Sequence, residues 1–134
     1  MKKSTKQKTI LVIEDERPLV AVIQTKLESS NFIVTNALTV EQGLHYLDDI
    51  PNIDAIWLDH YLLGEKTGLD FVAKLKNERS KWRHIPIFVV SNTASSTNVQ
   101  TYMRLGVDMY CVKAEHRLDQ IVQDIRYFLD NSKE

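Results

Sequence analysis

Five short runs of apolar residues recur along the chain, and each is nearly continuous instead of alternating with polar residues. The runs are Ile10–Ile13, Phe32–Val34, Ile53–Leu58, Ile85–Val90 and Met109–Val112. Neighbouring side chains of a strand point to opposite sides of its sheet, so a continuous apolar run needs cover on both faces. The pattern therefore predicts five strands of a parallel sheet with helices packed on both sides.

Between these runs, apolar residues recur three and four positions apart, the spacing that places side chains along one face of a helix. The predicted stripes span Leu19–Leu27, Val40–Leu47, Leu69–Leu75, Val99–Met103 and Leu118–Leu129. Residues typical of helix ends support them: Pro18 near the start of the first, Thr39 before the second and Gly106 after the fourth. The segment 95–98 is a cluster of capping residues at the entrance to the fourth helix.

Strand and helix thus alternate five times, which is typical of an open sheet with right-handed crossovers. An eightfold barrel needs about 200 residues or more, and this chain has 134. We therefore expect an α/β fold, a doubly wound (βα)5 open parallel sheet of five strands. The length suits one domain: residues 9–131 as the folded unit, 1–8 as a flexible basic tail and 132–134 as a C-terminal tail.

Composition excludes several classes of protein. With 18 acidic and 17 basic residues the formal net charge is −1, without the basic excess of a dedicated nucleic-acid binder. No apolar run approaches the roughly 18 residues of a membrane span, and the apolar stretch behind the basic start is too short for a signal peptide. The single cysteine, Cys111, cannot form an internal disulfide, which fits a reducing cytosol. We expect a cytoplasmic protein that binds neither nucleic acid nor membrane directly.

Chemically distinctive residues follow four of the five predicted strands: Glu14 and Asp15, Asp59, Ser91 and Lys113. Taken singly, each has an ordinary structural explanation, such as a helix cap for Asp15 or a surface lysine for Lys113. In an open parallel sheet, however, the carboxyl ends of the strands meet at one edge, where ligands bind. Together these residues indicate a site at that edge.

Three carboxylates brought close together repel one another and require a cation. Their oxygen atoms favour Mg²⁺, whose octahedral coordination is completed by waters and a phosphate. A metal ion, an ammonium group and a hydroxyl together suit phosphoryl transfer, in which catalysis is mainly positioning and charge stabilisation. We expect Asp59, the central carboxylate, to be the nucleophile and to form an acyl phosphate.

From about Thr9 to Leu129 the sequence resembles the receiver domain of two-component response regulators, the family of the bacterial chemotaxis regulator. The resemblance rests on the acidic pair and on Asp59, Ser91 and Lys113 at successive strand ends. It implies the flavodoxin-like strand order 2-1-3-4-5. It also implies that Asp59 accepts the phosphoryl group, that Ser91 hydrogen-bonds this group and that Lys113 pairs with it.

The resemblance further implies a set of magnesium ligands. Mg²⁺ would bind Asp59, Asp15 and the backbone carbonyl of Tyr61, and it would bind Glu14 through a water molecule. No other cofactor is implied. The four histidines lack the spacing of a zinc site; we interpret His60 as a loop residue beside the site.

Three positions depart from the family's usual pattern. Glu14 stands where aspartate is commoner, which the family tolerates. Ala114 follows Lys113 where proline is usual, and the family's Lys–Pro bond is typically cis. A cis bond before alanine costs about 3–4 kcal/mol, so we expect either a trans bond in a rearranged loop or a cis bond held by the fold. Leu63 stands where proline is frequent, in a loop to Gly68 that is about one residue longer than usual.

The leading hypothesis is a single-domain response regulator that receives a phosphoryl group from a histidine kinase or a histidine phosphotransfer protein. Ser91 and Tyr110 would form a switch, Tyr110 matching an aromatic position that rotates inward in the family; a half-buried strand tyrosine is the alternative. Phosphorylation would then change binding of a downstream protein. Such a domain catalyses only its own phosphorylation and dephosphorylation. The Met1 start and polar end favour a stand-alone protein; dimerisation through the fourth and fifth helices is left open.

Two other classes compete with this hypothesis. One is a pseudo-receiver that binds a partner constitutively without phosphorylation, which the departures at Leu63 and Ala114 favour. The other is an enzyme of similar fold. A dehalogenase-type phosphatase needs a second aspartate where Tyr61 stands, and residues 14–16 are all acidic and would repel the phosphate of a flavin nucleotide.

Overall fold

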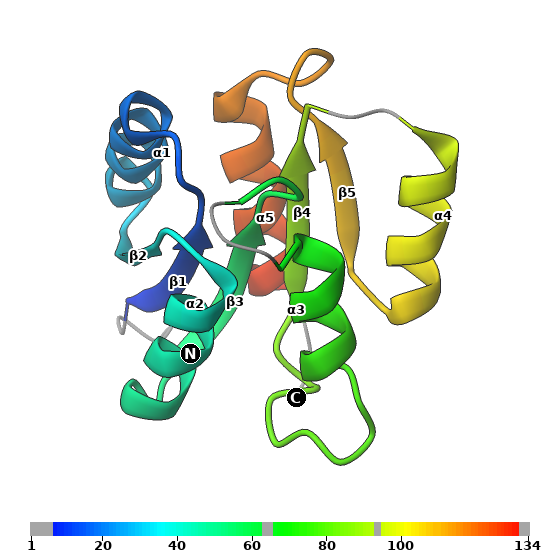
Figure 1. Cartoon of the computed structure of the whole chain (residues 1–134). Coiled ribbons are helices and arrows are strands. Elements are labelled where there is room, and N and C mark those ends of the chain that lie inside the picture. The colour runs from blue at the N-terminus through cyan, green and yellow to red at the C-terminus, as the bar shows by residue number, and fades with distance from the viewer. Residues whose placement is uncertain (1–6, 63–65, 93–94, 132–134) are drawn as a thin grey trace.

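The computed structural model describes residues 7–62, 66–92 and 95–131. Over these ranges strands and helices alternate as the apolar pattern predicts (Figure 1). The strands are β1 (Lys8–Ile13), β2 (Phe32–Ala37), β3 (Ile53–Leu58), β4 (Ile87–Ser91) and β5 (Met109–Val112). The helices are α1 (Arg17–Ser29), α2 (Val40–Asp49), α3 (Gly68–Leu75), α4 (Ser96–Leu105) and α5 (Leu118–Asp130). In this part of the chain, no helix is both long and apolar enough to cross a membrane.

All neighbouring strands of the sheet are parallel, in the order β2-β1-β3-β4-β5. The predicted fold class and strand order are therefore confirmed. The chain first moves outward from β1 to β2 and then returns to the other side of β1 for β3, β4 and β5. The direction of winding thus reverses between β1 and β3, which places the carboxyl ends of these two strands at the crevice where such sheets bind ligands.

The sheet is covered on both faces because its strands bury successive side chains on opposite sides. In β1, Ile10 and Val12 pack with residues of α1 and α5, whereas Leu11 and Ile13 pack with residues of α2, α3 and α4. All four side chains are fully buried. Each such burial contributes about 1.5–3 kcal/mol, so the two apolar layers fix the register of the central strands and hence the positions of the residues at their ends.

Two strand boundaries differ from the apolar runs. β4 begins at Ile87 although Ile85 is buried, because the chain at Pro86 only begins to pair with β3: its carbonyl accepts a bond of 2.9 Å from the amide of Ile56. β2 continues to Ala37, three residues past Val34, since it stays in register with β1 to the end. β1 begins at Lys8, one residue inside the segment that the sequence assigned to the N-terminal tail; residues 1–6 lie outside the described ranges.

The predicted helix ends are confirmed at three positions. The side chains of Thr39 and Ser95 cap α2 and α4 by accepting a hydrogen bond from the backbone amide of the third residue of each helix. Gly106 ends α4 with φ of 104°, the left-handed conformation that glycine adopts without strain. At the start of α5, Arg117 is the N-cap without a side-chain cap bond, and Nδ1 of His116 lies 3.2 Å from the carbonyl oxygen of Val112.

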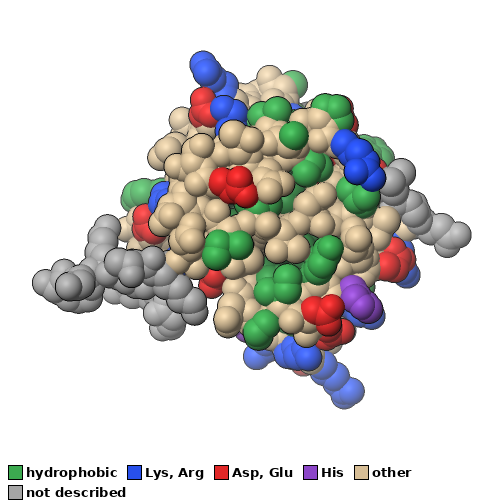
Figure 2. Space-filling view, turned by 90° about the vertical axis from the view of Figure 1, so that its left-hand side faces the viewer, with side chains coloured by type: hydrophobic (Ala, Val, Ile, Leu, Met, Phe, Trp, Pro, Cys, Tyr) green, Lys and Arg blue, Asp and Glu red, His purple; other side chains and the backbone are tan. Residues whose placement is uncertain are grey.

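Figure 2 shows the face of the molecule that lies on the left in Figure 1. This face carries charges of both signs, scattered among polar and hydrophobic side chains. Val22 of α1 and Ile33 of β2, two of the more exposed hydrophobic residues, belong to elements on this side. The mixture agrees with the nearly balanced charge of the sequence. The described residues on this face thus mix charges of both signs, without a continuous basic band among them.

Candidate functional site

The acidic residues predicted to form a site lie where the winding of the sheet reverses. Glu14 and Asp15 follow β1, and Asp59 follows β3. Two backbone bonds align these segments: the amide of Glu14 donates to the carbonyl of Ala37, and the amide of Asp59 donates to the carbonyl of Ile13, both at 3.0 Å. The central strands therefore bring residues 45 positions apart in the chain to one place.

Glu14, Asp15 and Asp59 form a compact acidic cluster, with one carboxylate oxygen of each within 4.8 Å of the others. Glu14 and Asp59 are buried, at 1% and 7% exposure, whereas Asp15 is half-buried. Within the described ranges, no other group of three or more His, Cys, Asp or Glu side chains converges in this way. A set of oxygen donors with one member open to solvent fits a hard divalent cation such as Mg²⁺ or Mn²⁺.

Lys113 brings one positive charge to this cluster. Its ammonium group lies 3.1 Å from a carboxylate oxygen of Glu14 and 3.7 Å from one of Asp59, and its side chain is only 12% exposed. The lysine is held at the end of β5 because its backbone amide donates to the carbonyl of Ser91 at 2.8 Å. One ammonium group against three carboxylates leaves an excess of negative charge, which a bound cation would offset.

The pKa values of two cluster residues are raised, mainly by burial. Burial raises the pKa of Glu14, and the neighbouring Asp59 raises it further, while Lys113 acts in the opposite direction. Burial also raises the pKa of Asp59, against the lowering effects of Lys113 and of backbone hydrogen bonds from His60 and Tyr61. Both raised pKa values mean that, without a bound cation, ionising these carboxylates costs more free energy in the folded protein than in water.

Ser91 and Tyr110, the two predicted switch residues, lie side by side on neighbouring strands. Ser91 is fully buried at the end of β4. Tyr110 of β5 is half-buried, and its side chain forms a hydrogen bond with Ser91. The tyrosine ring also contacts the ring of Tyr102 of α4, with centroids 5.7 Å apart. The hydroxyl pair therefore joins the sheet edge to α4, and whether it moves stays a prediction.

The remaining family-derived positions have varied outcomes. The side chain of Tyr61 is 61% exposed and packs edge-on against His60. Only its backbone is therefore available to the acidic cluster. No peptide bond of the described residues is cis, and the bond between Lys113 and Ala114 is therefore trans. Of the two alternatives considered for this loop, the trans bond holds. Leu63 lies outside the described residues.

His60 and Tyr102 are features of this region that the sequence analysis missed. His60 was interpreted as a loop residue, yet it is only 6% exposed, and its Nδ1 lies 2.7 Å from the hydroxyl of Tyr102, which is fully buried. Tyr102 belongs to the apolar stripe of α4, so its ring was expected inside, but its hydroxyl needs a partner there. A histidine directly after Asp59 was the available signal that this loop holds a buried polar group.

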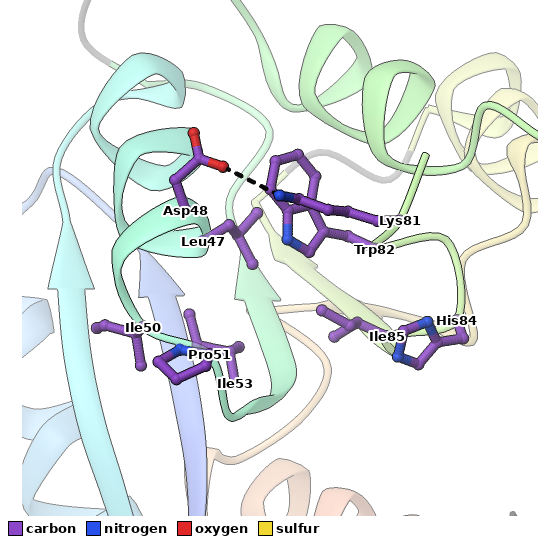
Figure 3. Close-up of a pocket in the computed structure, with 9 residues that line it drawn as sticks. All are labelled: Leu47, Asp48, Ile50, Pro51, Ile53, Lys81, Trp82, His84 and Ile85. Carbon is purple, nitrogen blue, oxygen red and sulfur yellow. Dashed lines mark ion pairs between the residues drawn. The ribbon is translucent and has the colours of Figure 1, made fainter. Parts of the chain in front are cut away.

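A separate hollow of about 310 Å³ lies at the opposite end of the sheet, beside the start of β3 and β4 (Figure 3). Its walls come from α2 and the turn after it, and from the segment before β4. Figure 3 shows Lys81 beside Trp82, with its ammonium group 3.6 Å from Asp48 across the hollow. None of the predicted site residues lines this hollow, so it is distinct from the acidic cluster.

Comparison with known sequences gives a consistent result. The model of the response regulator receiver domain family matches residues 10–126. The two-component response regulator ORR5 of Oryza sativa subsp. japonica is 31% identical over 104 residues, which cover 78% of this chain and 76% of that protein. The transcriptional regulatory protein CpxR of Escherichia coli (strain K12) is 30% identical over 104 residues, but these cover only 42% of CpxR.

Solved structures share the fold at lower identity. The phosphorylated cyanobacterial phytochrome response regulator RcpA superposes with a TM-score of 0.84 at 24% identity, covering 96% of this chain and 98% of RcpA. The Mn²⁺-bound form of response regulator Rcp1 gives a TM-score of 0.81 at 23% identity, covering 94% and 97%. A CheY-like receiver domain protein from Methanospirillum hungatei gives 0.82 at 22% identity, covering 93% and 95%. These similarities show the same fold over nearly the whole length of each chain.

Proposed function

Because this chain belongs to the response regulator receiver domain family, we propose that it accepts a phosphoryl group on Asp59 in the presence of Mg²⁺. The observation that carries the proposal is the convergence of Glu14, Asp15 and Asp59 within 4.8 Å, with the ammonium of Lys113 against them. The donor would be a sensor histidine kinase or a histidine phosphotransfer protein, as two-component response regulators require. This class of donor, together with the lone buried Cys111, supports a location in the cytoplasm.

Mg²⁺ would be held by Asp15 and Asp59 and by the backbone carbonyl of Tyr61, with Glu14 acting through a metal-bound water. The oxygen donors of the cluster suit this ion, and a Mn²⁺-bound form is known for the similar response regulator Rcp1. When bound, the ion supplies positive charge against the phosphoryl oxygens. The excess of carboxylates over ammonium groups in the cluster supports this assignment.

In the transfer step, a carboxylate oxygen of Asp59 attacks phosphorus. A new oxygen–phosphorus bond forms as the phosphorus–nitrogen bond of the donor phosphohistidine breaks, which leaves an acyl phosphate and returns the histidine. The ammonium of Lys113 would shift from its carboxylate partners toward the phosphoryl oxygens, and the hydroxyl of Ser91 would donate to one of them. These two groups would act mainly by stabilising the negative charge on the phosphoryl oxygens.

Phosphorylation would act as a switch between two conformations. If the Ser91 hydroxyl turns toward the phosphoryl group, its hydrogen bond with Tyr110 changes, and the contact of Tyr110 with Tyr102 carries this change to α4. The altered surface of α4, β5 and α5 would then bind a downstream protein, while the chain catalyses only its own phosphorylation and dephosphorylation. Dimerisation through this surface is a further use that the same switch could control.

A pseudo-receiver that binds its partner without phosphorylation is the second candidate. One geometric observation favours it: Lys113 lies nearer to Glu14 than to Asp59, at 3.1 Å against 3.7 Å, in a loop where Ala114 replaces the usual proline. If that pairing persists, Glu14 would compete with a phosphoryl group on Asp59 for the lysine. The two candidates differ in one measurable property, which is covalent uptake of phosphate.

Intact-mass measurement after incubation with Mg²⁺ and acetyl phosphate tests the proposal directly. The wild-type protein should gain the mass of one phosphoryl group, and Asp59→Asn should gain none. Asp49→Asn is the matched control, since Asp49 is an exposed aspartate at the end of α2, away from the cluster. Failure of the wild-type protein to take up phosphate from acetyl phosphate and from a histidine kinase would favour the pseudo-receiver.

A further inference from the structure

A buried hydrogen bond joins α4 to the loop that carries the predicted phospho-acceptor. The hydroxyl of Tyr102 lies 2.7 Å from Nδ1 of His60, and the two side chains are 0% and 6% exposed. Their rings meet edge-on with centroids 5.6 Å apart. The loop after β3 and the middle of α4 are therefore linked by a polar contact inside the apolar layer on that face of the sheet.

The start of α3 is shaped around this hydroxyl. A Cβ atom on Gly68 would lie 2.4 Å from the Tyr102 hydroxyl and 2.9 Å from the carbonyl oxygen of Asp59, so any larger residue would force one of these groups to move. The amide of Gly68 donates to the carbonyl of His60 at 3.0 Å. The Tyr102 hydroxyl thus occupies a space bounded by α3 and by the backbone of residues 59–60, where it has little room to turn elsewhere.

Burial favours the uncharged form of each of the two side chains. Burial raises the pKa of Tyr102 above its ordinary value, and burial lowers the pKa of His60 below its own. A buried hydroxyl or imidazole that lost this partner would have no other side-chain hydrogen bond among the described residues, and an unpaired buried polar group is costly. Removal of one partner should therefore disturb the position of the other and of the peptide groups attached to it.

His60 stands between the residues that the proposed mechanism uses. Asp59 precedes it and Tyr61 follows it, and the backbone amides of His60 and Tyr61 hydrogen-bond the Asp59 carboxylate. A change in the backbone dihedral angles of His60 would reorient the two peptide groups that carry these amides, and would displace Tyr61, whose carbonyl is the proposed metal ligand. A side chain of α4 can in this way control the orientation of groups at the acidic cluster without touching it.

We propose that Tyr102 is a positioning residue: its hydrogen bond to His60 fixes the peptide groups of residues 59–61, so that divalent-metal affinity at the acidic cluster depends on α4. The inference rests on the proposed function insofar as it assumes that the cluster binds a metal. Because coupling between two sites is reciprocal, metal binding must in turn restrain α4 through the same bond.

Metal affinity of hydroxyl-deleted variants tests this inference. Mn²⁺ binding, measured by calorimetry and by the electron spin resonance signal of free Mn²⁺, should weaken about fivefold or more in Tyr102→Phe. His60→Phe should weaken it similarly, and the double variant should lose little more than either single one, since both remove the same bond. Tyr127→Phe is the matched control, because its hydroxyl lies on a side chain of α5 that is 71% exposed.

A second readout separates positioning from a general loss of stability. In the metal-free protein, amide hydrogen exchange at His60, Tyr61 and Gly68 should be faster in Tyr102→Phe than in Tyr127→Phe, by more than the change in global unfolding predicts. A variant that is merely less stable would raise exchange evenly and keep the wild-type Mn²⁺ affinity. That result would overturn the inference.

The possible failures remain distinguishable. If the wild-type protein binds Mn²⁺ and takes up phosphate while Tyr102→Phe matches it in affinity and in exchange, Tyr102 is not a positioning residue and the proposed function stands. If the wild-type protein neither binds Mn²⁺ nor takes up phosphate, the proposed function fails and the link to metal affinity fails with it. Exchange at residues 59–61 in the metal-free variants then still decides whether Tyr102 orients the loop.

Discussion

The ammonium group of Lys113 lies 3.1 Å from a carboxylate oxygen of Glu14, although the two residues are 99 positions apart in the chain. The contact joins the end of β5 to the end of β1 across the mouth of the acidic cluster. A glutamate reaches farther than an aspartate by one methylene group, and here the longer side chain meets the lysine. The pair therefore holds the ammonium group of Lys113 closer to Glu14 than to Asp59, its other partner at 3.7 Å.

Glu14→Gln should separate the two roles of this carboxylate. The amide keeps the shape of the side chain but removes a buried charge that repels Asp59, so the free energy of unfolding without metal should rise by about 1 kcal/mol. Affinity for Mg²⁺ should fall about tenfold, because a carboxylate that supports the bound ion is lost. Urea unfolding in EDTA and magnesium titration measure the two effects. Glu41→Gln, at an exposed position of α2, is the control; a less stable Glu14→Gln would mean that the lysine pair outweighs the repulsion.

In the metal-free protein, the contribution of the acidic cluster to stability should fall as the pH rises from the acid range toward neutrality. The pKa values of Glu14 and Asp59 are raised in the folded protein from ordinary values of 4.5 and 3.8, mainly by burial. Above those ordinary values the unfolded chain has released protons that the folded chain still holds, so the free energy of unfolding decreases with rising pH until the raised pKa values are passed. Urea unfolding at successive pH values in EDTA measures this slope.

Mg²⁺ provides the internal control for the pH experiment. A bound cation favours the charged carboxylates, so the contribution of the cluster to the slope should disappear at saturating Mg²⁺. Asp59→Asn should also flatten the slope in EDTA, since it removes one titrating group and one charge that acts on Glu14. Identical slopes for wild type and Asp59→Asn, with and without the ion, would contradict the assignment of the effect to this cluster.

Cys111 should react very slowly with alkylating reagents in the folded protein. Burial between β4 and α5 leaves its side chain 3% exposed and raises the pKa of its thiol to about 11, from an ordinary value of 9.0. At a given pH below both values the folded protein thus holds about a hundredfold less thiolate than the unfolded chain, and thiolate is the reactive form. Iodoacetamide labelling followed by mass should therefore track unfolding in urea. Rapid labelling without urea would show that β5 opens locally.

The sequence predicted the fold and the place of the acidic cluster because both depend on coarse properties. Continuous apolar runs require two covered faces, and parallel strands bring their carboxyl ends together whatever the details of side-chain packing. Glu14, Asp15 and Asp59 could be placed at one edge from these two facts, together with the strand order that the family resemblance implied. The phosphorylation roles of these residues stay predictions until uptake of phosphate is measured.

What the sequence left undetermined depends on side-chain choices across several elements. The preference of Lys113 for Glu14 over Asp59 depends on distances that differ by a few tenths of an ångström. The buried bond between His60 and Tyr102 depends on the approach of α4 to a loop 42 positions earlier, and periodicity registers the tyrosine only as an apolar residue. Such contacts arise when the layers pack, and local patterns do not encode them.

Gly68→Ala should be markedly less stable than Gly43→Ala, although both replace a buried glycine of a helix. At Gly68 the added Cβ would meet the Tyr102 hydroxyl at 2.4 Å and the rigid backbone carbonyl of Asp59 at 2.9 Å, and relief requires moving a helix or the loop. Overpacking of this kind costs about 1–3 kcal/mol. At Gly43 the nearest atom, at 2.8 Å, is Cδ1 of Ile13, the far end of a flexible side chain.

The Gly43 variant also gains helix propensity, by about 1 kcal/mol for alanine over glycine in a helix interior. This gain offsets the local shift of the isoleucine, so the free energy of unfolding of Gly43→Ala should stay near the wild-type value, while that of Gly68→Ala falls by about 2 kcal/mol. Urea unfolding of the two variants side by side measures the difference. If Gly68→Ala were as stable as Gly43→Ala, the hydroxyl of Tyr102 would have to move aside freely. The link between α4 and the loop after Asp59 would then be weaker than the 2.7 Å hydrogen bond between Tyr102 and His60 indicates.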